Sequence, residues 1–172
     1  SSCAGMWSYV IGDTVKFVDL DPPRILVTGR TSYMLSAFGE HLIGEQIESA
    51  VTSGADAINA TISDYSVGSV MPEKEGELGG HLYIVEFLET DMNEARLNTF
   101  AQTLDQKLVE TNEDYKAHRS GGFGLHAPKI HAVPPGTFAT WMKSRGKLGG
   151  QNKVPRIIND AELFQNLRDQ VK

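Results

Sequence analysis

An almost continuously apolar segment, Leu82-Tyr83-Ile84-Val85-Glu86-Phe87-Leu88, lies near the middle of the chain. Such a run is typical of a central strand in a sheet. Directly after it, Asp91 and Glu94 form a capping-box pattern that predicts the start of a helix. Apolar residues then recur at helical spacing, at Leu97, Phe100, Ala101, Leu104 and Leu108. The sequence therefore predicts a central strand followed by the longest helix.

The residues before this strand predict a helix, a strand and a loop. Apolar residues spaced as on one helix face occur at Ile43, Ile47, Ala50 and Val51. Gly54 can end this helix. Alternation of Ile58, Ala60 and Ile62 with polar neighbours favours a half-buried strand. The linker Pro72-Glu73-Lys74-Glu75-Gly76-Glu77 is charged, so we expect an exposed hairpin loop there.

The remaining elements lie at the two ends of the chain. Residues 7–30 have the pattern of a two-stranded β-ribbon with a turn at Asp21-Pro22-Pro23. Residues 129–133 predict a short strand. Two further helices are indicated, one with the apolar face Phe138, Trp141 and Met142, the other capped by Asn159 with Glu162 and carrying Leu163, Leu167 and Val171.

This order of elements predicts an α+β fold, a small antiparallel sheet with helices packed on it, preceded by the ribbon. We expect two parts, a β-ribbon and hinge segment over residues 1–38 and an α+β domain over residues 39–172. The ribbon is too small to fold alone, so it packs on the body or on a neighbour. Because the chain starts without Met and enters a strand-like stretch at once, we expect it to be a fragment of a longer protein.

Composition narrows the class of protein. The chain has 172 residues and a formal net charge of −6, which disfavours an extended nucleic-acid or anionic-membrane surface. Its one cysteine, Cys3, excludes an internal disulfide and a Cys-rich zinc site, and fits a reducing cytoplasm. No apolar run approaches the roughly twenty residues that cross a bilayer. The spacing of His118, His126 and His131 matches no compact ligand pair, so we expect no metal site.

Three places carry polar residues suited to binding a nucleotide. Asp13 follows Gly12 at a strand break, where a carboxylate can accept both ribose hydroxyls, although on this segment alone a solvated Gly-Asp turn is the better explanation. Arg30 ends a strand, where it can reach a phosphate or form a surface ion pair. The basic segment 146–156 includes Lys147, Lys153 and Arg156, and is either a phosphate-binding loop or a solvated linker.

Taken together, four short segments resemble the plant auxin-responsive (Gretchen Hagen) acyl-acid amido synthetases. Residues 4–13, ending in Tyr9-Val10-Ile11-Gly12-Asp13, resemble the family's "AGLYRYRVGD". Gly29-Arg30 with Leu35-Ser36 resembles "RKNVLLS", and Pro135-Gly136-Thr137-Phe138 resembles "PGTF". Gln151-Asn152-Lys153-Val154-Pro155-Arg156 is similar to "QYKTPR". Residues 29–48 are also similar to the hinge pattern of the wider adenylate-forming superfamily.

The resemblance implies a carboxyl-terminal cap domain, about a third of an enzyme whose larger amino-terminal domain is absent here. In that family ATP and a carboxylic acid give an acyl-adenylate and pyrophosphate, and an amino acid then forms an amide. ATP and Mg would be bound mainly with the absent domain. By the same resemblance, Asp13 would hold the ribose hydroxyls with Tyr9 beside the nucleotide, and Arg30 would lie near the ribose and phosphates. Lys153 would reach the α-phosphate, and Ser32 would be the hinge residue, which is usually acidic in related enzymes.

One departure concerns the acyl acceptor. Where the plant enzymes carry Lys, this sequence has Glu40-His41-Leu42, so His41 takes a cofactor-binding position with a titratable side chain. The Glu40-His41 pair is similar to acyl-CoA ligases, which keeps a thioester-forming ligase open as an alternative. A non-catalytic α+β interaction module is another. We expect the fragment alone to be inactive, with an apolar patch around Trp7, Tyr9 and Phe38 that docks the large domain or forms dimers.

Overall fold

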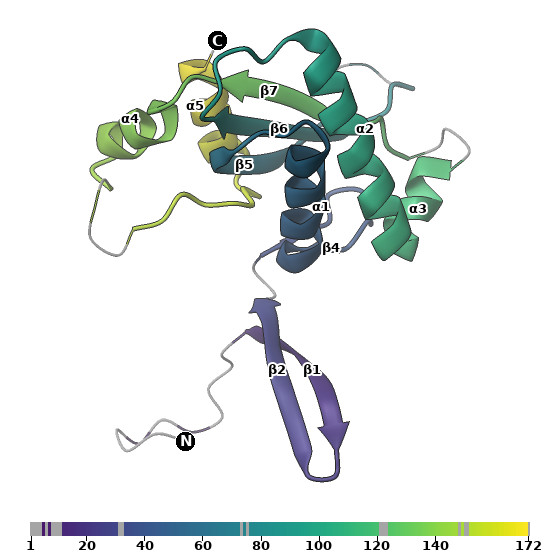
Figure 1. Cartoon of the computed structure of the whole chain (residues 1–172). Coiled ribbons are helices and arrows are strands. Elements are labelled where there is room, and N and C mark those ends of the chain that lie inside the picture. Colours follow the sequence, from purple (N-terminus) through teal and green to yellow (C-terminus); the bar gives the residue numbers. More distant parts are fainter. Residues whose placement is uncertain are drawn as a thin grey trace.

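The computed structural model describes residues 5, 7, 12–30, 33–72, 74, 76–120, 124–147, 149 and 152–171. These residues form a two-stranded ribbon that projects from an α+β body (Figure 1). In the ribbon, β1 (Asp13–Leu20) pairs antiparallel with β2 (Pro23–Arg30). The predicted ribbon is therefore confirmed over these two strands, while residues 8–11 of the prediction lie outside the described part of the chain.

The body is built on a three-stranded sheet in the order β5-β6-β7. Strand β5 (Ile62–Val70) is antiparallel to β6 (Gly80–Phe87), and β7 (Lys129–Val133) is parallel to β6. The predicted central strand is thus confirmed, as is the α+β class. The pair β6-β7 is parallel because α2 (Glu94–Thr111) and α3 (Glu113–Arg119) carry the chain back before β7 begins.

Helices cover both faces of this sheet, which explains why β6 is apolar along nearly its whole length (Figure 1). On one face pack α1 (Gly44–Ala57) and α2, and on the other α4 (Thr137–Ser144) and α5 (Ala161–Gln170). Side chains of β6 alternate accordingly, with Tyr83 and Val85 in the first cluster and Ile84 in the second. Each face buries its own hydrophobic cluster.

Two boundaries in the first half of the body differ from the prediction. Helix α1 continues through Gly54 to Ala57, because this glycine serves a close contact and not a helix end. A Cβ at Gly54 would meet the Phe100 ring at 3.0 Å, so the missing side chain lets α1 and α2 approach. Ile58 and Ala60 then lie in the turn before β5, which begins only at Ile62.

Both predicted caps are displaced from the observed ones. The cap of α2 is Asn93, whose side chain accepts the Arg96 N–H, and Asp91 instead forms an ion pair with Arg96 at 2.7 Å. The cap of α5 is Asp160, while the Asn159 amide donates to the Met34 carbonyl. In both places two residues able to cap lie close together, and only the backbone geometry selects one.

Three short elements were not predicted, because they have too few residues to show a hydrophobic period. They are α3 and the paired strands β3 (Met34–Leu35) and β4 (Leu42–Ile43). Among the described residues, no helix is both long enough and apolar enough to cross a bilayer.

Two tyrosines in the core provide a matched test of packing. The Tyr83 side chain is fully buried, and none of the described residues gives its hydroxyl a hydrogen bond, whereas the Tyr115 hydroxyl donates to Asp105 at 2.7 Å. We expect Tyr83→Phe to raise the free energy of unfolding by about 1 kcal/mol and Tyr115→Phe to lower it by about 1 kcal/mol. Urea unfolding of this chain measures both changes. Equal losses of unfolding free energy in the two variants would contradict the conclusion that the Tyr83 hydroxyl lacks a hydrogen bond among the described residues.

Candidate functional site

Two neighbouring cavities lie where the ribbon meets the body. The first, of about 680 Å³, is lined by Asp13 and by residues of α1 and β5. The second, of about 800 Å³, is lined by Lys153 and residues around α4. They share three lining residues, Tyr33, Glu48 and Arg156. The structure therefore places Asp13 and Lys153, which are distant in sequence, on walls of adjoining cavities.

The segment that carries Lys153 is fixed to the sheet just beyond this residue. The Pro155 carbonyl accepts a hydrogen bond from the Ser66 hydroxyl at 2.7 Å. The Arg156 carbonyl accepts the Val67 N–H at 2.8 Å, and the Val67 carbonyl accepts the Ile158 N–H at 2.9 Å. Lys153 itself is exposed. The predicted basic loop thus ends in an anchored backbone, and the exposed Lys153 just before it lines the second cavity.

Asp13 is the first residue of β1, and it pairs with Arg30 in the register of the ribbon. Its side chain is partly buried and lines the first cavity. A carboxylate at this place is an acceptor for paired hydroxyl groups. For Arg30 only the backbone is described, and the predicted residues Tyr9 and Ser32 lie outside the described residues.

Arg156, Tyr65 and Asp64 form a cluster in the wall between the cavities. The sequence analysis did not identify this cluster as a site. The Arg156 guanidinium lies over the Tyr65 ring, 4.5 Å from its centre, with Nε 3.9 Å from Asp64 Oδ1. Burial raises the pKa of Asp64 above its usual range, although the Tyr65 N–H and Arg156 oppose this effect. The basic segment gave a signal for Arg156, but no local pattern pointed to Tyr65 or Asp64, which only the register of β5 brings to it.

A buried carboxylate ties α4 to the sheet beside the second cavity. Glu86, the one acid in the apolar strand β6, accepts the N–H groups of Gly136 at 3.0 Å and Phe138 at 2.9 Å. Gly136 caps α4 with a left-handed φ of 89°. The Glu86 carboxylate thus holds the first turn of α4, where it also complements the helix dipole.

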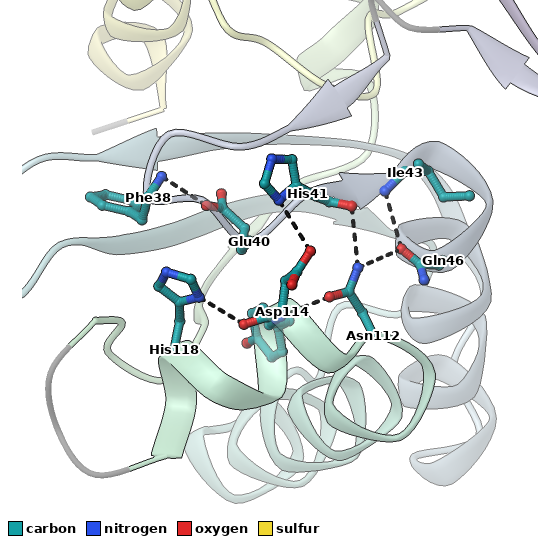
Figure 2. A network of polar contacts seen from close by, with 9 residues as sticks. Phe38, Glu40, His41, Ile43, Gln46, Asn112, Asp114 and His118 are labelled. Carbon is teal, nitrogen blue, oxygen red and sulfur yellow. Dashed lines mark hydrogen bonds and ion pairs between the residues drawn. The ribbon is translucent and has the colours of Figure 1, made fainter.

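His41 lies in a separate polar network, which Figure 2 shows. Its backbone is left-handed, with φ of 45°, and its Nδ1 lies 3.1 Å from Asp114 Oδ2. The Asn112 amide donates to the His41 carbonyl and to Gln46 Oε1, which also accepts the Ile43 N–H (Figure 2). His41 lines neither the Asp13 nor the Lys153 cavity. The structure therefore does not bring it together with those two residues.

Next to it, Glu40 forms a buried pair with His81 of β6, which sequence reasoning missed. Glu40 Oε1 lies 2.8 Å from His81 Nε2, and Glu40 Oε2 accepts the Phe38 N–H at 2.8 Å. Burial acts to raise the pKa of Glu40, but the hydrogen bonds from His81 and from backbone N–H groups outweigh it and hold the pKa below its ordinary value of 4.5. The ionised carboxylate thus fastens the turn before β4 to the sheet.

Solved acyl acid amido synthetases share this fold. The structure of "GH3.15 acyl acid amido synthetase" covers 100% of this chain with a TM-score of 0.79 at 20% identity. That of "AtGH3.15 acyl acid amido synthetase in complex with 2,4-DB" gives 0.77 at 19% identity, again over 100% of this chain. The chain covers 32% of either relative, about a third of its length. A 2-hydroxyisobutyryl-CoA ligase has a TM-score of only 0.44 to this chain, over 84% of this chain and 25% of the ligase.

The fold is accordingly that of the last third of these synthetases. The GH3 family C-terminal domain matches residues 45–162, more than half of the chain. This chain therefore belongs to the GH3 family and contains its C-terminal domain. No curated protein matches the sequence at a significant level.

Proposed function

We propose that this chain is the cap domain of an ATP-dependent ligase that joins a carboxylic acid to an amino acid through an acyl-AMP intermediate. The observation that carries the proposal is the position of Asp13 and Lys153 on adjoining cavities. A nucleotide spanning both would meet a carboxylate at its ribose and an ammonium at its phosphates. Membership of the GH3 family and the likeness to acyl acid amido synthetases support the same function.

In the proposed reaction the acid's carboxylate oxygen attacks the α-phosphorus, a new P–O bond forms, and pyrophosphate leaves with the electron pair of the broken bond. Lys153 is placed to offset the negative charge that gathers on the α-phosphate oxygens. Asp13 would accept the two ribose hydroxyls. We also propose Tyr9, Arg30 and His41 as cofactor-binding residues and Ser32 as the hinge.

The cofactors of this reaction would be ATP and Mg. Among the described residues, no group of three or more His, Cys, Asp or Glu side chains is arranged to hold a metal ion. By its resemblance to the family, we propose that the cation is held mainly by the rest of the enzyme, and that this chain contributes Asp13 and Lys153 to the nucleotide. A reducing cytoplasm is the compartment that we propose for it.

The partner that we propose for the ribbon is the amino-terminal domain of the parent enzyme, meaning the full-length protein to which this chain would belong. Exposed apolar side chains are concentrated on β1 and β2, namely Val15, Phe17, Val18, Leu20, Ile25, Leu26 and Val27. The register places Phe17 opposite Ile25 and Val15 opposite Val27, which puts these four on one face. Trp7 is also exposed, whereas Phe38 is half-buried beside His81. Without that domain we expect the chain to be inactive and prone to dimerise.

Coenzyme A is the alternative acyl acceptor, because of the Glu40-His41 pair described above. The purified parent enzyme, with a panel of carboxylic acids, should catalyse acid-dependent ATP–pyrophosphate exchange. Release of AMP should then rise on addition of an amino acid and yield an amide. A rise with coenzyme A in place of amino acids would favour the thioester ligase. Absence of exchange with every acid would support a non-catalytic module and contradict the proposal.

The assignment of Asp13 predicts a selective defect. In the parent enzyme, Asp13→Ala should raise the KM for ATP roughly 10-fold or more, since hydrogen bonds to a charged group are lost. The wild type should prefer ATP to 2′-deoxy-ATP, and the variant should lose this preference. Asp19→Ala removes an exposed carboxylate from the same strand and serves as the control. Unchanged discrimination between the two nucleotides in Asp13→Ala would contradict the ribose assignment.

A further inference from the structure

The wall shared by the two cavities contains a cation that the proposed reaction has not yet used. Arg156 lines both cavities and also a third, smaller one beside α1. Its side chain is 46% exposed, so the guanidinium is neither buried in the core nor free in solvent. It occupies the boundary between the place proposed for the ribose and the place proposed for the α-phosphate.

The orientation of this guanidinium is fixed from two sides. Its backbone carbonyl accepts the Val67 N–H from β5, which holds the main chain. Its Cζ lies 4.5 Å from the centre of the Tyr65 ring, and this tyrosine is only 2% exposed. One donor of the guanidinium, Nε, lies 3.9 Å from Asp64 Oδ1. A guanidinium carries five N–H donors, so one such ion pair does not use the whole group. Arg156 thus lines both cavities from a main chain that is held to β5.

The lining of the second cavity holds equal numbers of acidic and basic side chains, which differ in exposure and in partners. Its three carboxylates are Glu48, Asp64 and Glu86, and its three cations are Lys147, Lys153 and Arg156. Glu86 is taken up by the N–H groups at the start of α4, and Asp64 accepts the Tyr65 N–H. Two of the three carboxylates therefore have partners within the chain, and one of these, Asp64, also lies 3.9 Å from Arg156 Nε. Glu48, Lys147 and Lys153 are exposed.

We propose that Arg156 binds the α-phosphate of the nucleotide, as a second cation beside Lys153. This inference rests on the proposed function and names a further binding residue of that site. The guanidinium donates to a non-bridging phosphate oxygen, between the ribose held by Asp13 and the ammonium of Lys153. A planar fork suits phosphate, while the lysine acts as a point charge.

The proposal can be tested in the parent enzyme by comparing two arginines that each lie over an aromatic ring, Arg156 and Arg145. Arg145 also lies over a buried ring, 4.6 Å from the centre of Trp141, but it lines none of the five cavities described for this chain. In ATP–pyrophosphate exchange, Arg156→Ala should lower kcat/KM for ATP roughly 10- to 100-fold. Arg145→Ala should stay within about twofold of the wild type, because surface substitutions away from a site have small effects. Arg156→Lys should recover only part of the loss, since it keeps the charge without the fork.

Titration with AMP gives a second readout that needs no turnover. Arg156→Ala should bind AMP about 10-fold more weakly than the wild type, and Arg145→Ala should bind it equally well. Equal AMP affinity in the wild type and Arg156→Ala, or an equal loss in both alanine variants, would overturn the inference. Lack of acid-dependent exchange in the wild type would instead refute the proposed function, and the AMP titration would still decide the role of Arg156.

Discussion

Replacing Lys153 by Ala in the parent enzyme should slow acid-dependent ATP–pyrophosphate exchange by about 100- to 1,000-fold, the range for removing one charge-stabilising group from a transition state. The physical reason is that negative charge gathers on the α-phosphate as pyrophosphate leaves, and the exposed Lys153 lines the cavity proposed for this phosphate. The loss should fall mainly on kcat, because the charge is greatest in the transition state.

Two further variants make this result specific. Lys143→Ala removes an exposed lysine of α4 that lines neither nucleotide cavity, and its exchange rate should match that of the wild type. Lys153→Arg keeps the charge on a bulkier group and should recover part of the rate. Exchange by Lys153→Ala at more than a tenth of the wild-type rate would remove Lys153 from the proposed mechanism.

Glu40→Ala should destabilise this chain by about 3 kcal/mol, because removal of one partner from a buried pair leaves the other without compensation. His81 and the Phe38 N–H both lose their acceptor in the core. His41→Ala is the matched control, since its contact with Asp114 is exposed and should be worth less than about 1 kcal/mol. Urea unfolding at neutral pH measures the difference. Equal losses of unfolding free energy in the two variants would contradict the stabilising role of the buried Glu40–His81 pair.

The same pair predicts how stability depends on pH. Because the folded state holds the pKa of Glu40 below its ordinary value of 4.5, the ionised carboxylate stabilises the fold above that value. The contribution is lost as pH falls from about 4.5 through the lower folded pKa. Glu40→Gln cannot ionise, so the difference in unfolding free energy between it and the wild type should shrink in this acidic window. A difference that stayed constant from neutral to acidic pH would argue against the ionised pair.

The long elements were predictable because each repeats its hydrophobic period several times. The helix carrying Phe100 and Leu104 and the strands of the ribbon have this property, whereas the central strand was predicted from its continuous apolar run. Boundaries were less predictable, since a glycine that ends a helix and one that admits a neighbour look alike in sequence. Gly54 belongs to the second kind because Phe100 packs against it, a contact between two helices that no local pattern reports.

The candidate site likewise has residues that the sequence predicted and residues that it did not. Lys153 and Asp13 were identified because each lies in a short segment that resembles the family, whereas the Glu40–His81 pair has no such signal. Its two members are far apart in sequence and meet only once the turn before β4 lies on β6. The stacking of Arg156 on Tyr65 likewise depends on how the segment after Lys153 aligns with β5. Contacts of this kind arise from tertiary structure.

Strand β6 joins two distant regions of the body through its polar side chains. Near its beginning, His81 fastens the turn that leads into His41, and near its end Glu86 fastens the first turn of α4 beside the Lys153 cavity. A strand of a hydrogen-bonded sheet has a nearly constant length, so it acts as a spacer between them. The turn before His41 and the first turn of α4 are therefore held at a fixed separation, and any displacement of one would be passed to the other through β6.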